Sequence, residues 1–242
     1  MQKRIALAII AASVVAAIVV GVFTISYFNS SGKNATSTND IDSILVSKDD
    51  KSYVVYAEEW WKRFAETPTT RNGAYDKTGE NCTVNQNITN VWFLDGTDGG
   101  TAERNCTVPS GRAIFAPIMA ISCSGQDFPG KTVVSYEEFK SCVDEPYKRL
   151  SKIELSVNGI NIPVDKLPGA LHVGPFDVIF PESQAVYDAK GGATKMMTVG
   201  TYFMLKPLSS GNHEIHFVGV LFDAKDPSFN LLIDVKYHLI VA

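Results

Sequence analysis

Between residues 52 and 67 apolar residues recur every three or four positions, which predicts one face of an α-helix. Ser52 can cap its first turn, and Pro68 ends it. A second helix is predicted after Ser135, because Ser135 and Glu138 form the capping-box pattern, in which each side chain binds the other residue's amide. The apolar face of the first helix consists of Tyr53, Ala57, Trp60, Trp61 and Phe64.

From residue 152 onward the apolar period changes to two, which is typical of half-buried strands. The Asn158–Gly159 pair within this region is a strong signal for a hairpin turn. Further upstream, Pro117 interrupts an apolar run and indicates an edge strand or a bulge. The predicted strands are 91–94, 101–108, 113–121, 153–157, 160–164, 176–181, 199–206, 212–222 and 231–241.

Many short strands joined by Gly- and Pro-containing turns predict a mainly β fold, an antiparallel β-sandwich with two peripheral helices at one end or edge. The register of the last hairpin can also be predicted, because a slip of one residue would move every apolar side chain to the wrong face. We expect Glu214 opposite Lys236 and His216 opposite Asp234, since the alternative places Glu214 opposite His238 and loses these complementary pairs.

The first 28 residues have a different pattern. After Lys3 and Arg4, the run from Ile5 to Phe28 has no charged residue, and it is long enough to cross a bilayer core of about 30 Å. A cleaved signal peptide is the alternative, although its apolar region is usually only about 7–15 residues long. We therefore expect a signal anchor at 1–28 with a cytoplasmic N-terminus, a polar tether at 29–50 and an exterior domain at 51–242. If the segment is cleaved, the domain is secreted.

Composition limits the classes of function. A chain of 242 residues with 45% apolar content can bury the core of one domain. It carries 22 basic and 26 acidic residues, with no basic run. Nucleic-acid binding requires a positive surface, so we exclude a nucleic acid as the partner.

The four cysteines are Cys82, Cys106, Cys123 and Cys142. Outside the membrane an even number of cysteines favours disulfides, and four cysteines allow three connectivities. We favour Cys82–Cys106 and Cys123–Cys142, because each bond closes a loop of modest length. The gaps are too wide for a zinc site, and no cysteine lies in a reactive-thiol motif.

Asn-x-Ser/Thr acceptor motifs for glycosylation lie in the first half of the chain, at Asn29, Asn34, Asn81, Asn87 and Asn105. Two of them belong to a repeated Asn-Cys-Thr tripeptide at residues 81–83 and 105–107. We expect these tripeptides to form the two ends of one exterior loop that a disulfide closes.

Several motifs occur in a characteristic order: V-W-F-L-x-G at 91–96, R-x-C-T-V-P-x-G at 104–111, I-F-x-P-I at 114–118, H-x-I-H-F at 213–217 and D-V-x-Y-H at 234–238. This order resembles a family of secreted bacterial and archaeal proteins of uncharacterised function. The resemblance covers roughly residues 55–242 and implies export, two disulfides and a compact β-rich domain. It transfers no catalytic residue, and many of these relatives carry an ordinary signal peptide where this chain has a longer apolar segment.

Histidines and methionines are the candidates for a metal site, because imidazole and thioether groups suit copper. His213 and His216 lie three residues apart on a predicted strand, so they point to opposite faces and cannot chelate one ion there. We favour surface histidines and core methionines, and predict no cofactor. The candidate ligands for copper are His172, His213, His216, His238, Met196 and Met197.

Two acidic groups suggest other chemistry. His216 with Asp234 resembles part of a hydrolytic triad. Ser110 lies in a turn and is the candidate nucleophile, but nothing in the sequence links it to His216, and no G-x-S-x-G motif occurs. Asp95 and Asp98 could offer oxygens to calcium, although their loop is too short for an EF-hand. We favour a cross-strand charge pair and a tight turn, respectively.

Trp60 and Trp61 are adjacent, so on a helix they diverge by about 100°, and one could remain exposed to stack on a sugar or a partner surface. Packing of both against the sheet is the favoured interpretation, and Trp92 is expected in the core. The sequence thus predicts a membrane-anchored exterior module that binds a cell-wall polymer, a glycan or an envelope protein. The alternative is a copper-dependent or hydrolytic enzyme that uses His216 and Asp234.

Overall fold

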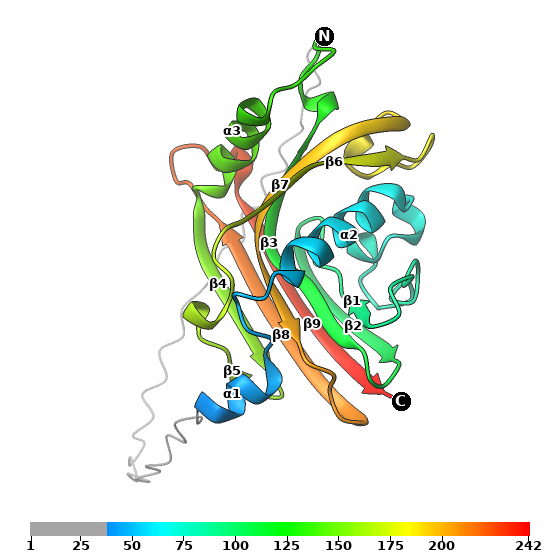
Figure 1. Ribbon diagram of the computed structural model, residues 1–242, viewed down its shortest axis with the longest axis vertical. Coiled ribbons are helices and arrows are strands. Elements are labelled where there is room, and N and C mark those ends of the chain that lie inside the picture. Colours follow the sequence, from blue (N-terminus) through cyan, green and yellow to red (C-terminus); the bar gives the residue numbers. More distant parts are fainter. Residues whose placement is uncertain (1–37) are drawn as a thin grey trace, which may run out of the picture. The chain divides into compact units, whose positions relative to one another are not determined.

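The computed structural model describes residues 38–242, which form a mainly β fold with two sheets (Figure 1). The strand order is β1-β3-β7-β6 in the four-stranded sheet and β2-β9-β8-β4-β5 in the five-stranded sheet. The predicted signal anchor and the first part of the tether lie outside the described residues. The strands are β1 (Val91–Phe93), β2 (Gly100–Val108), β3 (Ala113–Ser124), β4 (Leu150–Val157), β5 (Ile160–Asn161), β6 (Leu171–Phe180), β7 (Gly192–Leu205), β8 (Gly211–Leu221) and β9 (Leu231–Val241).

The two sheets share one apolar core, as a β-sandwich requires, and a second core lies on the outer side of the four-stranded sheet. β7 contributes to both cores, because its odd-numbered residues face the five-stranded sheet and its even-numbered residues face the other way. It is therefore buried without interruption from Met196 to Leu205, which explains the absence of alternation in its sequence.

The helix α2 (Ser52–Glu66) covers the outer face of the four-stranded sheet, where it packs against β6, β3 and β7 (Figure 1). The helix α3 (Tyr136–Tyr147) packs on β3 and β7, and the capping box of Ser135 and Glu138 is present as predicted. α2 thus covers a sheet face rather than an end or edge. The reason is that its broad apolar stripe needs a broad apolar surface.

The folded region begins earlier than the predicted boundary at residue 51. Helix α1 (Thr38–Ile44) places Ile41 in the core, and Leu45 follows it there. The amide of Val46 donates to the carbonyl of Met204 at 2.9 Å, which ties this segment to the end of β7. The second half of the expected tether is therefore part of the domain. A helix of seven residues, about two turns, with few apolar positions is too short to show a period.

Two strand pairs are parallel, which corrects the expectation of an antiparallel sandwich. β1 pairs with β3, and β2 pairs with β9, both in parallel. The cause is that the chain changes sheets twice: β1 lies in one sheet, β2 in the other, and β3 returns to the first. The turns after residues 94 and 108 are thus connections between sheets and not hairpin turns.

Two local predictions are confirmed. Val157 pairs with Ile160 around a two-residue turn in which Asn158 and Gly159 both have positive φ, 51° and 78°. The register of β3 against β7 shifts between Pro117 and Met119, which is the expected bulge.

The predicted register of the last hairpin is wrong: each residue of β8 pairs with the β9 residue two positions further along the chain than predicted. Glu214 faces His238 and His216 faces Lys236, so the apolar side chains keep the expected face but the offset differs. In the observed register His216 Nε2 still meets Asp234 Oδ1 diagonally, at 2.7 Å. His238 meets Glu103 of the neighbouring β2 at 2.7 Å, a contact that a consideration of the hairpin alone omits.

Within residues 38–242, none of the helices combines the length and the apolar character that a bilayer crossing requires.

Candidate functional site

Both predicted disulfides are present. Cys82–Cys106 joins the segment before β1 to β2, and Cys123–Cys142 joins β3 to α3. All four cysteines are therefore paired, and no thiol remains for catalysis or metal binding.

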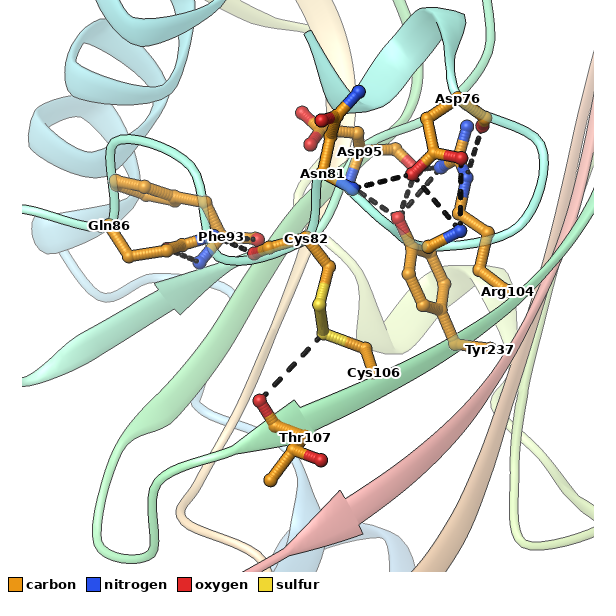
Figure 2. Close-up of a disulfide and its surroundings, with 11 residues drawn as sticks. Asp76, Asn81, Cys82, Gln86, Phe93, Asp95, Arg104, Cys106, Thr107 and Tyr237 are labelled. Carbon is orange, nitrogen blue, oxygen red and sulfur yellow. Dashed lines mark hydrogen bonds between the residues drawn. A yellow bond between two sulfur atoms is a disulfide. The ribbon is translucent and has the colours of Figure 1, made fainter. Parts of the chain in front are cut away.

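A buried arginine organises the chain beside the first disulfide (Figure 2). The Arg104 side chain is 1% exposed, and its guanidinium donates to the carbonyls of Asp76, Asp95 and Gly96 and to the hydroxyl of Tyr237. These bonds satisfy the charge without a directly paired carboxylate. Burial also raises the pKa of Tyr237, against the opposing effect of Arg104. We interpret this network as structural, since its polar atoms point into the core.

The carboxylate of Asp76 caps the same loop. It accepts the backbone amides of Thr78, Gly79 and Asn81 at 2.8–3.1 Å. Partial burial raises the pKa of Asp76, but these hydrogen bonds outweigh it and the pKa is lowered overall. The ionised carboxylate is therefore saturated by its own chain.

The aspartates of the predicted turn have separate roles. Asp95 is buried and forms an ion pair with Arg63 of α2, whereas Asp98 is exposed. Within the part of the chain that the structure describes, no three His, Cys, Asp or Glu residues are placed to hold a metal ion. The calcium hypothesis therefore has no support here.

Trp60 and Trp61 do not form a surface for sugar stacking. Their side chains are 4% and 2% exposed, and their indole N–H groups donate to the Leu94 carbonyl and the Tyr202 hydroxyl. The two rings diverge as predicted, but both directions lead into the core, because Tyr202 on β7 fills the space beside Trp61. Burial raises the pKa of Tyr202 to about 12. Trp92 is buried, as expected.

The copper candidates are distributed over separate surroundings. His213 contacts Asn158 and the carbonyl of Ser209, while His172 binds Asp144 of α3 at 2.6 Å. Burial raises the pKa of Asp144, but hydrogen bonds from Lys140 and His172 lower it overall. Met196 and Met197 are buried on opposite faces of β7. His213 and His216 likewise lie on opposite faces of β8, as predicted.

His216 and Asp234 are in contact, but Ser110, the turn serine named as a candidate nucleophile, lies far from them. Ser110 bonds to Ala242 after the end of β9, whereas His216 faces Lys236. About six strand residues, or roughly 20 Å, separate the two places. The pair belongs to an open layer of charge on the outer face of the five-stranded sheet.

That outer face carries alternating acidic and basic groups and two open depressions of about 650 Å³ each. The hydrogen bond from His238 lowers the pKa of Glu103. These groups bond to one another on a surface that is open to water, so they provide cross-strand stabilisation rather than an unsatisfied site. The ionisable residues of this outer face are Glu103, Glu214, His216, Asp234, Lys236 and His238.

The glycosylation motifs fall in accessible places where the structure describes them. Asn87 and Asn105 are exposed, and Asn81 is half-buried at the end of the Asp76 loop. Asn29 and Asn34 lie outside the described residues.

A groove that sequence reasoning missed runs along one edge of the four-stranded sheet. We call it the β3 groove; its volume is about 720 Å³. Five consecutive residues of β3, from Ala120 to Ser124, line its floor, which shows that the groove follows the strand edge. Its walls are formed by Asp98, Gln126, Asp127, Cys142, Pro146, Phe180, Tyr187, Asp188, Ala189, Lys190, Met196 and Leu231.

One wall is the connection between β6 and β7, which is fixed at both ends. Gln126 exchanges two hydrogen bonds with the backbone of Lys190, and the carbonyl of Gln184 accepts the amide of Thr69 at 2.7 Å. Tyr187 and Asp188 have positive φ values of 59° and 53°, and the Tyr187 side chain is 60% exposed. Consecutive left-handed residues other than glycine are costly and concentrate at functional sites.

A small side pocket of about 80 Å³ adjoins the groove. It shares Asp98, Ala120, Tyr187 and Leu231 with the groove and lies mainly among apolar side chains. Its further lining comes from Trp60, Trp61, Phe64, Ala74, Gly96, Thr97, Pro117 and Ile233.

Comparisons with known proteins do not supply a function. No family model matches the chain, and no curated protein matches it. Among solved structures, a cysteine protease inhibitor, EhICP2, from Entamoeba histolytica is similar at a TM-score of 0.27 with 11% identity, over 63% of this chain and 96% of that one. A similarity of this size carries no argument about fold or activity.

Proposed function

We propose that this protein is an exterior binding module, held at the membrane by its N-terminal apolar segment, that recognises an envelope component in the β3 groove. The observation that carries the proposal is the groove itself, an apolar depression with fixed walls beside a strand edge. Two disulfides support an oxidising location, since such bonds persist mainly outside the cytosol.

Binding is favoured over catalysis because of how the polar groups are used. His216 and Asp234 contact each other in a depression that is open to water, and Asp95 and Arg63 neutralise one another in the core. The groove, in contrast, offers apolar surface and exposed carboxylates that have room for a ligand.

The membrane location has its own test. In intact cells, added protease should digest the domain, and mass spectrometry of the protein should find both disulfides formed. Protection from the protease, or four free thiols, would contradict an exterior location.

The groove is tested with the full chain in detergent micelles. Ala189→Trp fills the groove, so we expect it to reduce co-sedimentation with an envelope fraction at least tenfold. Ile240→Trp is the matched control, because Ile240 is 52% exposed and lies on β9, away from the groove lining. Equal binding by the wild type and both variants would overturn the groove as the site.

A further inference from the structure

The edge of β3 that borders the groove lacks a strand partner. β1 pairs only with residues 113–115 of β3, whereas the pairing of β3 with β7 continues to Ser124. From Ala116 to Ser124, therefore, one side of β3 is bonded to β7 and the other side forms no ladder with another strand among the described residues.

The direction of the backbone groups on this edge follows from bonds at its two ends. The carbonyl of Phe115 accepts the amide of Leu94, so the backbone groups of Phe115 point away from β7. Its partner on β7 is Met204, whose carbonyl accepts the amide of Val46, so the backbone groups of Met204 point away from β3. Alternation along β7 then turns Gly200 and Thr198 away from β3.

The partners of Gly200 and Thr198 are Ala120 and Ser122, which must likewise point away from β7 and into the groove. The amide of Ser124 provides an independent check, because it donates to the Asp127 carboxylate at 2.6 Å on this side. Ala120 and Ser122 thus present two amides and two carbonyls in strand geometry along the groove floor.

The walls specify what can occupy this edge. The floor from Ala120 to Ser124 is about 15 Å long, which matches an extended segment of four or five residues. Residues of the β6–β7 connection and of α3 flank this edge on its two sides. Flanking walls favour a single extended chain over the edge of a second folded copy, which brings its own neighbouring strands.

The chemistry of the lining adds two side-chain preferences. The side pocket, at about 80 Å³, is smaller than a cavity of about 150 Å³ that holds benzene, so it suits an aliphatic side chain. Asp98, Asp127 and Asp188 line the groove against one lysine, Lys190; the Asp127 carboxylate is bonded to Ser124, so Asp98 and Asp188 provide the negative charge that favours a cationic ligand.

We propose that an extended peptide segment of a partner protein adds to β3 as an extra strand, bonding to Ala120 and Ser122. One of its aliphatic side chains enters the side pocket, and a lysine or arginine faces Asp98 and Asp188. This inference rests on the proposed function of the β3 groove and names its ligand class. Main-chain bonds supply affinity in such strand addition, and the pockets supply specificity.

The probe is a phage-displayed random octapeptide library selected on the full chain in micelles. We expect enrichment of β-branched residues with one aliphatic anchor and one Lys or Arg, and affinities are then measured by fluorescence anisotropy with a synthetic copy. Ser122→Pro should weaken binding at least tenfold, because proline removes the outward amide. Ser122→Ala keeps the outward amide and removes the hydroxyl, which bonds to Tyr187, so it should weaken binding much less than Ser122→Pro.

The fold should tolerate Ser122→Pro, since Pro117 already occupies β3 and the Ser122 amide takes no part in the ladder with β7. Peptide N-methylation gives a second readout that needs no variant of the protein. Methyl groups on the edge-facing amides should abolish binding, and methyl groups on the alternate amides should leave it. Asp188→Asn should weaken a basic peptide about threefold or more at low salt, whereas Asp165→Asn, an exposed aspartate outside the groove, should have no effect.

The outcomes separate this inference from the proposed function. If peptides lose binding in Ala189→Trp but bind Ser122→Pro normally and ignore N-methyl position, strand addition is overturned and the groove remains a binding site. If no peptide is enriched while a cell-wall oligosaccharide binds in a manner blocked by Ala189→Trp, the ligand class is wrong. If the wild type self-associates and Ser122→Pro does not, a second copy is the occupant. If Ala189→Trp has no effect on any ligand, both proposals fail.

Discussion

The two sheets use their outer faces in opposite ways. The outer face of the four-stranded sheet is sealed by α2, which buries Phe115 and Tyr202 beneath aromatic side chains. The outer face of the five-stranded sheet meets water through polar cross-strand pairs such as the hydrogen-bonded His216 and Asp234. The comparison teaches that His216 and Asp234, the polar pair most suggestive of chemistry, lie on an uncovered sheet face that is exposed to solvent. The groove, in contrast, follows an unpaired edge of the sealed sheet.

Removal of an aromatic ring from the sealed face should have the largest effect. Phe115 is fully buried and contacts the rings of Tyr53, Phe93 and Tyr202, so Phe115→Ala should lower the free energy of unfolding by about 3–5 kcal/mol. Ile240→Ala, on the open face, should change it by no more than about 0.5 kcal/mol. Urea denaturation measures both. Similar losses for the two variants would show that the open face is also covered.

The inner face of the five-stranded sheet carries Arg104, whose side chain is buried and bonded to the carbonyls beside the first disulfide. Arg104→Met leaves the carbonyls of Asp76 and Gly96 without their donor, while the Asp95 carbonyl keeps the Tyr237 hydroxyl, so we expect a loss of roughly 3 kcal/mol in unfolding free energy. Arg112→Met is a matched control, because Arg112 lies over the Trp92 ring at 5.4 Å and its loss should cost less than about 1 kcal/mol. A stable Arg104→Met protein would mean that water replaces the guanidinium.

The smallest effect is expected on the charged face. His238 lowers the pKa of Glu103, so His238→Gln should raise that pKa towards the ordinary value of 4.5, as followed by NMR titration of the carboxylate. A lowered carboxylate pKa stabilises the fold above pH 4.5, and this contribution is lost as the pH falls through the lowered value. The two proteins should therefore become equally stable at lower pH. His213→Gln should leave the Glu103 titration unchanged, and a shift there would refute the pairwise cause.

Local signals predicted much of the fold. The capping box at Ser135, the Asn158–Gly159 turn and both disulfides are features of short segments, and each is present. Trp60 and Trp61 show where such reasoning weakens. The helical period placed them correctly, but only the position of Tyr202, far along the chain, decides that the second ring is also buried.

Features that depend on distant partners were missed. The register of the last hairpin is decided partly by Glu103 on β2, and the parallel pairs follow from changes of sheet that turn composition does not reveal. The β3 groove has no sequence signal of its own, because it arises where β1 stops at Phe93 while β3 continues. Residue types therefore indicate His216 and Asp234 as candidates for chemistry. Tyr187 and Ala189, which line the groove, have no feature in the sequence that marks them as functional.

The last strand also has a practical consequence for experiments on this molecule. Leu231, at the start of β9, borders the groove, whereas Ala242, just past its end, bonds to Val108 and Ser110. Eleven strand residues at about 3.3 Å each separate the two places by roughly 35 Å. A fluorophore or affinity handle attached after Ala242 would thus report on ligand capture without obstructing the ligand's path.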